Sequence, residues 1–318
     1  MPRLSVNVAS QIDRDQLAFA SQLGVECGFT WVEESQTGLE NLRSIKGAIE
    51  DHGLSLYMMS CMAYGKSKHI HLALPDRDRV IEDYQRFVQH LGEIGVGVTT
   101  FTWEPDQVWT TSQDGSSRGA SARYVDLDEL TSHGLTHGRT YGREELWDNF
   151  AYFMEKMIPV LRESGVRLAL HPNDPPTVES LGGVPCLIHG RTDYDRAFSL
   201  APADVLGMEF CCGCWLEGAP TFGDIPDGIR HFAAGDRLLI VHFRNVSAPL
   251  PEFTETFLDN GFADMYPFMR TFVEVGYQGT ITLDHTPRFP EPYDAGAGTG
   301  YAVGYMRALL ERARAEIG

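Results

Sequence analysis

Four short apolar segments in the second half of the chain each end in a side chain that can bind a metal ion. In chain order, these residues are His171, Cys211, His242 and Asp284. One histidine or cysteine at the end of a strand is usually a packed core residue, but here the same position is filled four times in succession. Because the carboxyl ends of parallel strands meet at one mouth of a barrel, we predict that two imidazoles, a thiolate and a carboxylate surround one divalent ion.

Residue types and spacing leave the metal and the thiolate ligand open. One thiolate with two imidazoles suits zinc, whereas a carboxylate with open positions for an oxygen-rich substrate suits manganese or iron(II). Cys212 and Cys214 compete with Cys211 for the thiolate position. In an extended strand Cys211 and Cys212 point to opposite faces, so only one of them can face the barrel interior.

The elements that must position these residues alternate regularly along the chain. Segments rich in β-branched or aromatic residues predict eight strands, at 4–8, 29–32, 54–59, 98–103, 167–171, 205–211, 238–243 and 280–284. Amphipathic segments predict helices at 16–23, 39–51, 78–94, 143–163, 225–234, 265–275 and 301–315. The alternation predicts an α/β protein, a single (β/α)8 TIM barrel over residues 1–318. An open doubly wound sheet is the rival, but no glycine-rich turn follows the first strand.

One long segment, residues 104–142, interrupts this alternation after the fourth strand. It is polar, rich in Gly, Ser and Thr, and too long for an ordinary connection. Because it follows the end of a strand where barrel enzymes keep their active sites, we predict an insertion that acts as a lid or a subunit contact. A disordered insertion is the alternative, against which Trp109, Tyr124 and Tyr141 argue, since disordered segments contain few aromatic residues.

Composition excludes several classes of partner. The 318 residues carry a formal net charge of −18, which repels phosphate backbones and anionic membrane surfaces, so no nucleic-acid partner is expected. The first residues lack the pattern of a signal peptide, and no apolar run reaches the roughly 18 residues of a membrane span. The six cysteines are not spaced as a disulfide scaffold. These features predict a cytoplasmic enzyme without membrane contact.

Several sequence blocks together resemble the manganese-dependent mannonate dehydratase family, whose members are xylose-isomerase-like TIM barrels. The blocks are HPNDPP at 171–176, FCCG at 210–213, VHFRNV at 241–246, LDH at 283–285 and GYAVGYMRALLE at 300–311. Their order and spacing fit nearly the whole chain. The resemblance implies that the four strand-end residues are the metal ligands, prefers Cys211 over Cys212, and implies Mn²⁺, with Fe²⁺ and Zn²⁺ as alternatives. It also implies catalytic roles for His285 and Tyr301.

The activity implied by this resemblance is the dehydration of a sugar acid, D-mannonate or a related aldonate, to a 2-keto-3-deoxy acid. That reaction removes a weakly acidic proton next to a carboxylate and protonates a departing hydroxyl, so it needs an acid–base pair, for which His285 and Tyr301 are candidates. We expect Arg244 to bind the substrate carboxylate, with an ion pair to Asp264 as the alternative. His285 could instead only support the metal ligand, and Tyr301 could only pack at the rim.

Two loops depart from the family pattern. Thr254 and Leu258 stand where histidines are expected, and residues 67–71 read SKHIH in place of a His-Glu-Asp-Ile-Lys run. Because sites that hydrogen-bond one pattern of hydroxyls reject another, these changes predict altered substrate recognition with the metal site retained. His69 and His71 are either new substrate contacts or solvent-facing polar residues.

Two other functions stay open. A metal-dependent sugar or sugar-acid isomerase or epimerase of the xylose-isomerase-like group would use a similar metal to move a proton without losing water. A catalytically inactive sugar-acid-binding homologue would keep the barrel and lose the chemistry. For each of these functions, the long insertion and the barrel fold predict a homo-oligomer.

Overall fold

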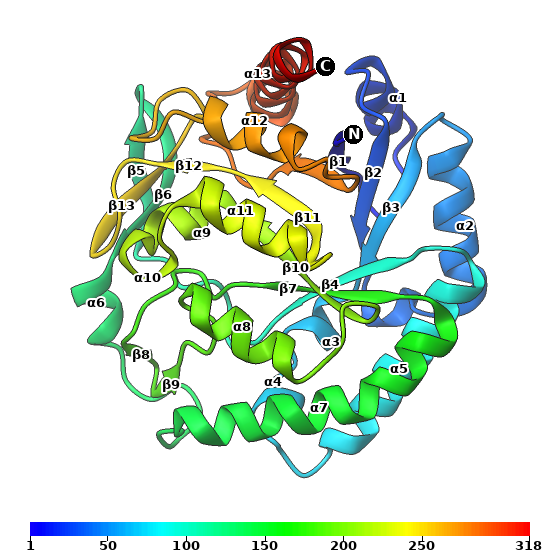
Figure 1. Ribbon diagram of the computed structural model, residues 1–318, viewed down its shortest axis with the longest axis vertical. Helices are drawn as coiled ribbons and strands as arrows, with labels where there is room; N and C mark the ends of the chain where they lie inside the picture. The colour runs from blue at the N-terminus through cyan, green and yellow to red at the C-terminus, as the bar shows by residue number, and fades with distance from the viewer.

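Eight parallel strands at the centre of the computed structural model form the predicted barrel (Figure 1). The structure describes residues 1–318, except that only the helical backbone assignment is described for residues 294 and 295. The barrel strands are β1 (Arg3–Asn7), β2 (Cys27–Trp31), β3 (Ser55–Ser60), β4 (Val98–Thr102), β7 (Arg167–His171), β10 (Leu206–Cys211), β11 (Leu238–Phe243) and β14 (Thr280–Leu283). All eight predicted strands are therefore confirmed within one or two residues, and the rival open sheet is wrong.

The order of the strands is β3-β2-β1-β14-β11-β10-β7-β4, with parallel pairing throughout. Side chains bridge the seam between β3 and β4. The Ser60 hydroxyl lies 2.9 Å from the Thr99 hydroxyl and accepts a hydrogen bond from the Thr100 amide at 2.7 Å. An apolar layer that includes Phe29, Met58 and Ile240 packs together separately from the main core. The result is a nearly closed barrel, the closed form of a repeated strand–helix unit.

Helices surround the strands because each presents one apolar stripe. The long helices are α1 (Arg14–Gln22), α2 (Leu39–Glu50), α5 (Arg77–Glu93), α7 (Arg143–Ser164), α8 (Arg191–Ser199), α11 (Ile225–Ala234), α12 (Tyr266–Glu274) and α13 (Asp294–Ile317). In α5, for example, Val80, Tyr84, Phe87 and Leu91 are buried at helical spacing. Helix α8 was not predicted from the sequence. Only Tyr194 and Ala197 are buried in it, so its apolar stripe is too short to be recognised as helical spacing.

Short helices occupy the connections. They are the 3-10 helix η1 (Glu34–Gln36), and the α-helices α3 (Met62–Gly65), α4 (Lys68–His71), α6 (Leu127–Thr131), α9 (Cys212–Glu217) and α10 (Ala219–Phe222). A two-stranded ribbon, β8 (Ser180–Leu181) with β9 (Val184–Pro185), lies between β7 and α8. No helix among the residues the structure describes has the length and apolar character to cross a membrane.

The long segment after β4 folds as a hairpin beside the barrel. Strands β5 (Ser112–Ser117) and β6 (Ala120–Asp126) pair antiparallel, and β6 pairs with β13 (Glu252–Thr256), which pairs with β12 (Asn245–Val246). The hairpin therefore joins a four-stranded sheet with the connection that follows β11. In Figure 1 this sheet stands at one edge of the barrel.

Candidate functional site

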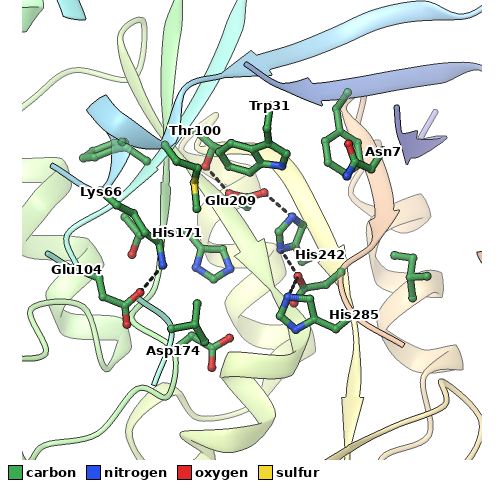
Figure 2. Close-up of a pocket in the computed structure, with 18 residues that line it drawn as sticks. Asn7, Trp31, Lys66, Thr100, Glu104, His171, Asp174, Glu209, His242 and His285 are labelled. Atoms are coloured by element: carbon green, nitrogen blue, oxygen red, sulfur yellow. Dashed lines mark hydrogen bonds and ion pairs between the residues drawn. The ribbon is translucent and has the colours of Figure 1, made fainter. Parts of the chain in front are cut away.

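A cavity of about 300 Å³ opens at the carboxyl ends of the barrel strands. Its lining includes His171, Glu209, His242, Asp284 and His285 on one side, and residues that end or follow β2, β3 and β4 on the other. Figure 2 shows the three histidines side by side at the centre of this cavity. The predicted mouth of the barrel is thus the place where polar side chains from both halves of the chain meet.

The four predicted ligands come together beside this cavity. One donor atom each from His171, Cys211 and His242 lie within 4.8 Å of one another. Asp284 completes the group, since its Oδ1 is 3.3 Å from His242 Nδ1 and its Oδ2 is 3.7 Å from Cys211 Sγ. His171 and Cys211 are the last residues of their strands, His242 is the last but one of β11, and Asp284 directly follows β14, so the sheet register sets the separation between them.

The two imidazoles are oriented as metal-binding histidines usually are. His171 Nδ1 lies 2.7 Å from the Pro172 carbonyl oxygen, which leaves Nε2 for another partner. His242 Nε2 lies 2.6 Å from Glu209 Oε1, and its Nδ1 faces another predicted ligand, Asp284, at 3.3 Å. Ligating histidines typically present one nitrogen to the metal and give the other to a carbonyl or a carboxylate. The residues present therefore fit a divalent ion.

The sulfur of Cys211 has partners that favour a thiolate. It accepts a hydrogen bond from the Cys214 amide at 3.4 Å and from the Arg244 guanidinium at 3.6 Å. Burial alone would raise the pKa of this thiol, but hydrogen bonding with Cys214 and the charge of Arg244 hold it well below its usual range. Burial raises the pKa of the Cys212 thiol well above its usual range. The group of three donors contains Cys211 and does not contain Cys212.

Glu209 is a site residue that the sequence analysis missed. It is 1% exposed, lines the cavity, and its other neighbour is the Thr100 hydroxyl. Burial would raise the pKa of Glu209, but His242 and His171 outweigh this and lower it. The signal that would have revealed it is a single charge inside the otherwise apolar strand β10, because such a charge needs a buried partner.

Arg244 does not line the cavity, so the expected contact with a substrate carboxylate is not seen in this structure. The side chain is 0% exposed and its Nε lies 2.8 Å from Asp284 Oδ2. Its terminal nitrogens reach Asp174 at 2.8 Å and Glu217 at 3.0 Å, and also contact Glu255. The alternative ion pair with Asp264 is not found among the described residues. Arg244 therefore links a predicted ligand to carboxylates behind the cavity.

His285 lies at the cavity, next to the predicted ligands. Its Nε2 is 3.3 Å from Asp284 Oδ1 and its Nδ1 is 2.9 Å from Glu255 Oε1. The surrounding protein would by itself lower the pKa of His285, but the charges of Asp284 and Glu255 raise it to about 9. The side chain is 43% exposed, so it also has access to a bound molecule.

Tyr301 lies outside the cavity lining, at an exposed position of α13. Its hydroxyl accepts a hydrogen bond from Arg118 at 3.3 Å, and its ring packs against Phe257 at 5.7 Å. Phe257 follows β13, the strand that carries Glu255, the partner of His285. The structure therefore shows no direct contact between Tyr301 and His285 among the described residues.

The altered loop residues contribute nothing to the cavity lining. His69 Nδ1 pairs with Asp76 at 2.6 Å, and His71 is buried, with its ring 4.2 Å from that of Trp103. Burial, with a contribution from Lys66, lowers the pKa of His71 to about 3. Thr254 lies in β13 opposite Tyr124 of the hairpin, and Leu258 is in the core. The expectation that His69 and His71 touch the substrate is therefore not met in this structure.

A charged pair on the opposite side of the cavity was also missed. Lys66 Nζ lies 2.6 Å from Glu104 Oε2, and both residues line the cavity. The two residues are 38 positions apart in the sequence. No local pattern signals such a pair, because it forms only when β3 and β4 lie side by side.

Comparison with known proteins gives a consistent result. The family model described as D-mannonate dehydratase (UxuA) matches residues 31–123 and 120–311. Mannonate dehydratase 2 of Halalkalibacterium halodurans is 30% identical over 274 residues, which cover 77% of this chain and 78% of the relative. Mannonate dehydratase of Thermotoga maritima is 27% identical over 315 residues, covering 85% and 86% of the two chains.

Solved structures show the same architecture. The crystal structure of mannonate dehydratase from Streptococcus suis serotype 2 matches with a TM-score of 0.88 and 23% identity, covering 100% of this chain and 96% of that one. A structure of L-ribulose 3-epimerase matches with a TM-score of 0.63 and 14% identity, over 99% of this chain and 97% of the other. At these identities the structural likeness establishes the barrel fold alone.

Proposed function

Because this chain belongs to the D-mannonate dehydratase family, a family of hydro-lyases, we propose that it removes water from D-mannonate and releases a 2-keto-3-deoxy acid. The observation that carries the proposal is the convergence of two imidazoles, a thiolate and a carboxylate beside a cavity that also exposes His285. A hexonate carries its charge at one end, and this part of the cavity is where that end would bind.

We propose that His171, Cys211, His242 and Asp284 hold a divalent cation, Mn²⁺ in the first place, with Fe²⁺ and Zn²⁺ as alternatives. A bound divalent ion polarises a carboxylate and stabilises negative charge that develops next to it. Glu209 fixes the ring of His242 through Nε2, and Arg244 keeps Asp284 and Cys211 in their charged forms. Glu209 and Arg244, which contact the proposed ligands from behind, thus fix the orientation of the ligand side chains.

We propose His285 and Tyr301 as the acid–base pair of the dehydration. His285 can move a proton at one ring nitrogen while Glu255 holds the other, which keeps the ring in one orientation. Tyr301 does not line the cavity in this structure, so this role requires that the segment carrying it moves toward the cavity.

The proposal is tested by incubating the purified protein with Mn²⁺ and a panel of aldonates. We expect a 2-keto-3-deoxy product from D-mannonate. Exchange of substrate hydrogen with deuterated water without dehydration would favour the isomerase or epimerase. Stabilisation by aldonates, seen as a higher Tm without any product, would favour the inactive binding homologue.

The metal site has a separate test that does not depend on activity. We expect the double variant His171→Ala with Asp284→Ala to lose bound manganese after dialysis, as measured by elemental analysis. A matched control replaces a surface pair of the same residue types, His231 and Asp195, which contact each other at 3.0 Å on exposed helices. Unchanged metal content in the first variant would contradict the four-ligand site.

We further propose a cytoplasmic enzyme that assembles as a homo-oligomer and binds a small anionic sugar acid. The acidic composition supports the absence of a nucleic-acid partner. Light scattering of the purified protein tests the oligomer, and a monomer at micromolar concentration would contradict it.

A further inference from the structure

The cavity has a second wall, whose chemistry the proposed dehydration does not use. This wall is largely apolar, with Trp31 at the end of β2, Met62 and Phe101 among its members. The Lys66–Glu104 pair stands in it, and the two side chains are only 13% and 6% exposed. Figure 2 shows this pair on the far side of His171 from His285.

Lys66 is the only lysine or arginine among the described residues that line the cavity. The loop that carries it packs tightly on β4, since a Cβ added at Gly65 would lie 3.1 Å from the Thr100 carbonyl oxygen. An ammonium group has three donors, and the structure assigns only one of them, to Glu104. Two donors of Lys66 and acceptor capacity of Glu104 are therefore left for a molecule in the cavity.

A donor and an acceptor side by side match the chemistry of a hydroxyl group, which both donates and accepts. The pair is neutral overall, so it offers little to a free anion. A second carboxylate placed here would face Glu104, whereas Asp174, which also lines the cavity, is already paired with the buried guanidinium groups of Arg123 and Arg244, at 2.8 Å each. Like charges in a partly desolvated site repel strongly, so this wall suits an uncharged, hydroxyl-bearing chain end.

We propose that Lys66 and Glu104 form a specificity subsite that binds the hydroxyl groups at the end of the sugar acid remote from its carboxylate, and that this subsite rejects diacids. The inference rests on the proposed function. The side of the cavity formed by the predicted metal ligands, here called the metal wall, must bind the carboxylate end so that the remote end can reach Lys66 and Glu104. It deepens that function by naming the residues that distinguish an aldonate from an aldarate.

Equilibrium binding separates the two ends of the ligand. The probes are D-mannonate, D-mannarate, which has a second carboxylate at C6, and D-glycerate, which keeps the acid end and lacks the remote hydroxyls. Affinities are measured by calorimetry on the Mn²⁺-loaded protein in a His285→Asn background, where turnover is blocked. We expect Lys66→Met to weaken D-mannonate binding by roughly 10- to 100-fold and to change D-glycerate binding by less than about twofold.

Glu104→Gln provides an independent arm. It removes the negative charge and keeps the shape, so we expect the affinity for D-mannarate relative to D-mannonate to rise by about tenfold or more. Lys66→Arg, which keeps the charge, should retain much of the D-mannonate affinity. Lys46→Met and Glu50→Gln are matched controls, because these residues form a lysine–glutamate pair on the surface of α2.

The outcomes separate the two hypotheses. If Lys66→Met, still folded by circular dichroism, weakens D-glycerate as much as D-mannonate, Lys66 acts at the acid end and the inference is wrong. If the unmodified protein dehydrates D-mannonate while all Lys66 and Glu104 variants bind the three acids like their parent, the inference fails and the proposed function stands. If the unmodified protein neither binds nor dehydrates any of these acids, the proposed function fails first.

Discussion

The two walls of the cavity are built in opposite ways. On the wall that carries the predicted ligands, Glu209 contacts His242, and Arg244 contacts Asp284 and Cys211 and also reaches three further carboxylates. On the opposite wall, one charged pair stands among apolar side chains, carried by the connections after β3 and β4. The proposed reaction chemistry would thus be tied to the core of the fold, while the proposed recognition would depend on a few residues whose replacement disturbs the core less.

Removal of the buried guanidinium gives the largest effect that this comparison predicts. Arg244→Met leaves Asp174, Glu217 and Asp284 without their shared cation, and breaking a buried ion pair costs about 3–5 kcal/mol. We expect a loss of that size in the free energy of unfolding, measured by urea denaturation. Lys66→Met, on the opposite wall, should cost less, about 1–3 kcal/mol, because it leaves one carboxylate, Glu104, without its cation.

The control for Arg244→Met is Arg230→Met. Arg230 is 45% exposed and pairs with Asp227 at 3.4 Å, so its loss should change stability by no more than about 0.5 kcal/mol. Equal destabilisation by Arg244→Met and Lys66→Met would contradict the proposed difference between the two walls, because the metal wall would then be no more strongly tied to the core than the wall that carries Lys66.

The next effect concerns Tyr301, which belongs to neither wall of the cavity. If Tyr301 transfers a proton, Tyr301→Phe should lower kcat by about 100-fold with little change in the affinity for Mn²⁺. The matched control is Tyr305→Phe, one turn further along α13. A decrease of less than about threefold in kcat would show that the hydroxyl only anchors Arg118, as it does in this structure.

A smaller effect isolates Glu209, the neighbour of the predicted ligand His242. Glu209→Gln keeps an acceptor for His242 Nε2 and removes the charge, so we expect Mn²⁺ affinity to fall by about tenfold. Glu209→Ala removes both the acceptor and the charge and should lower the affinity for Mn²⁺ by about 100-fold. Competition with a fluorescent chelator measures both values, and Glu179→Gln, at an exposed position of the β7–α8 connection, is the control. Unchanged affinity in both Glu209 variants would contradict the role of Glu209 in orienting His242.

The same contrast explains what could be predicted from the sequence. The convergence of the four predicted ligands could be expected from the sequence because each lies at the carboxyl end of its own strand, so the sheet register brings them together once the barrel is recognised. The role of Arg244 was not, since its partners Asp174, Glu217 and Glu255 come from three separate connections whose paths no local pattern encodes. The fold followed from the alternation of strands and helices.

The hairpin β5–β6 provides the smallest predicted effect and tests whether it belongs with the fixed or the variable wall. Arg118 binds Asp259 through two hydrogen bonds, at 2.9 and 3.0 Å, and its guanidinium lies 4.6 Å from the centre of the Phe257 ring. The side chain is 44% exposed, so Arg118→Ala should change global stability by less than about 1 kcal/mol.

Local opening should respond more clearly than global stability. We expect hydrogen exchange at residues 116–120, the tip of the hairpin, to accelerate by up to about fivefold in Arg118→Ala, while β6 stays protected by its ladder with β13. Arg43→Ala on α2, where an exposed arginine also pairs with a nearby glutamate, is the control. The ladder with β13 also positions Glu255 behind His285. Loss of protection throughout β6 would therefore mean that one surface ion pair controls the position of His285. The hairpin would then act as the predicted lid and would not be a fixed part of the metal wall.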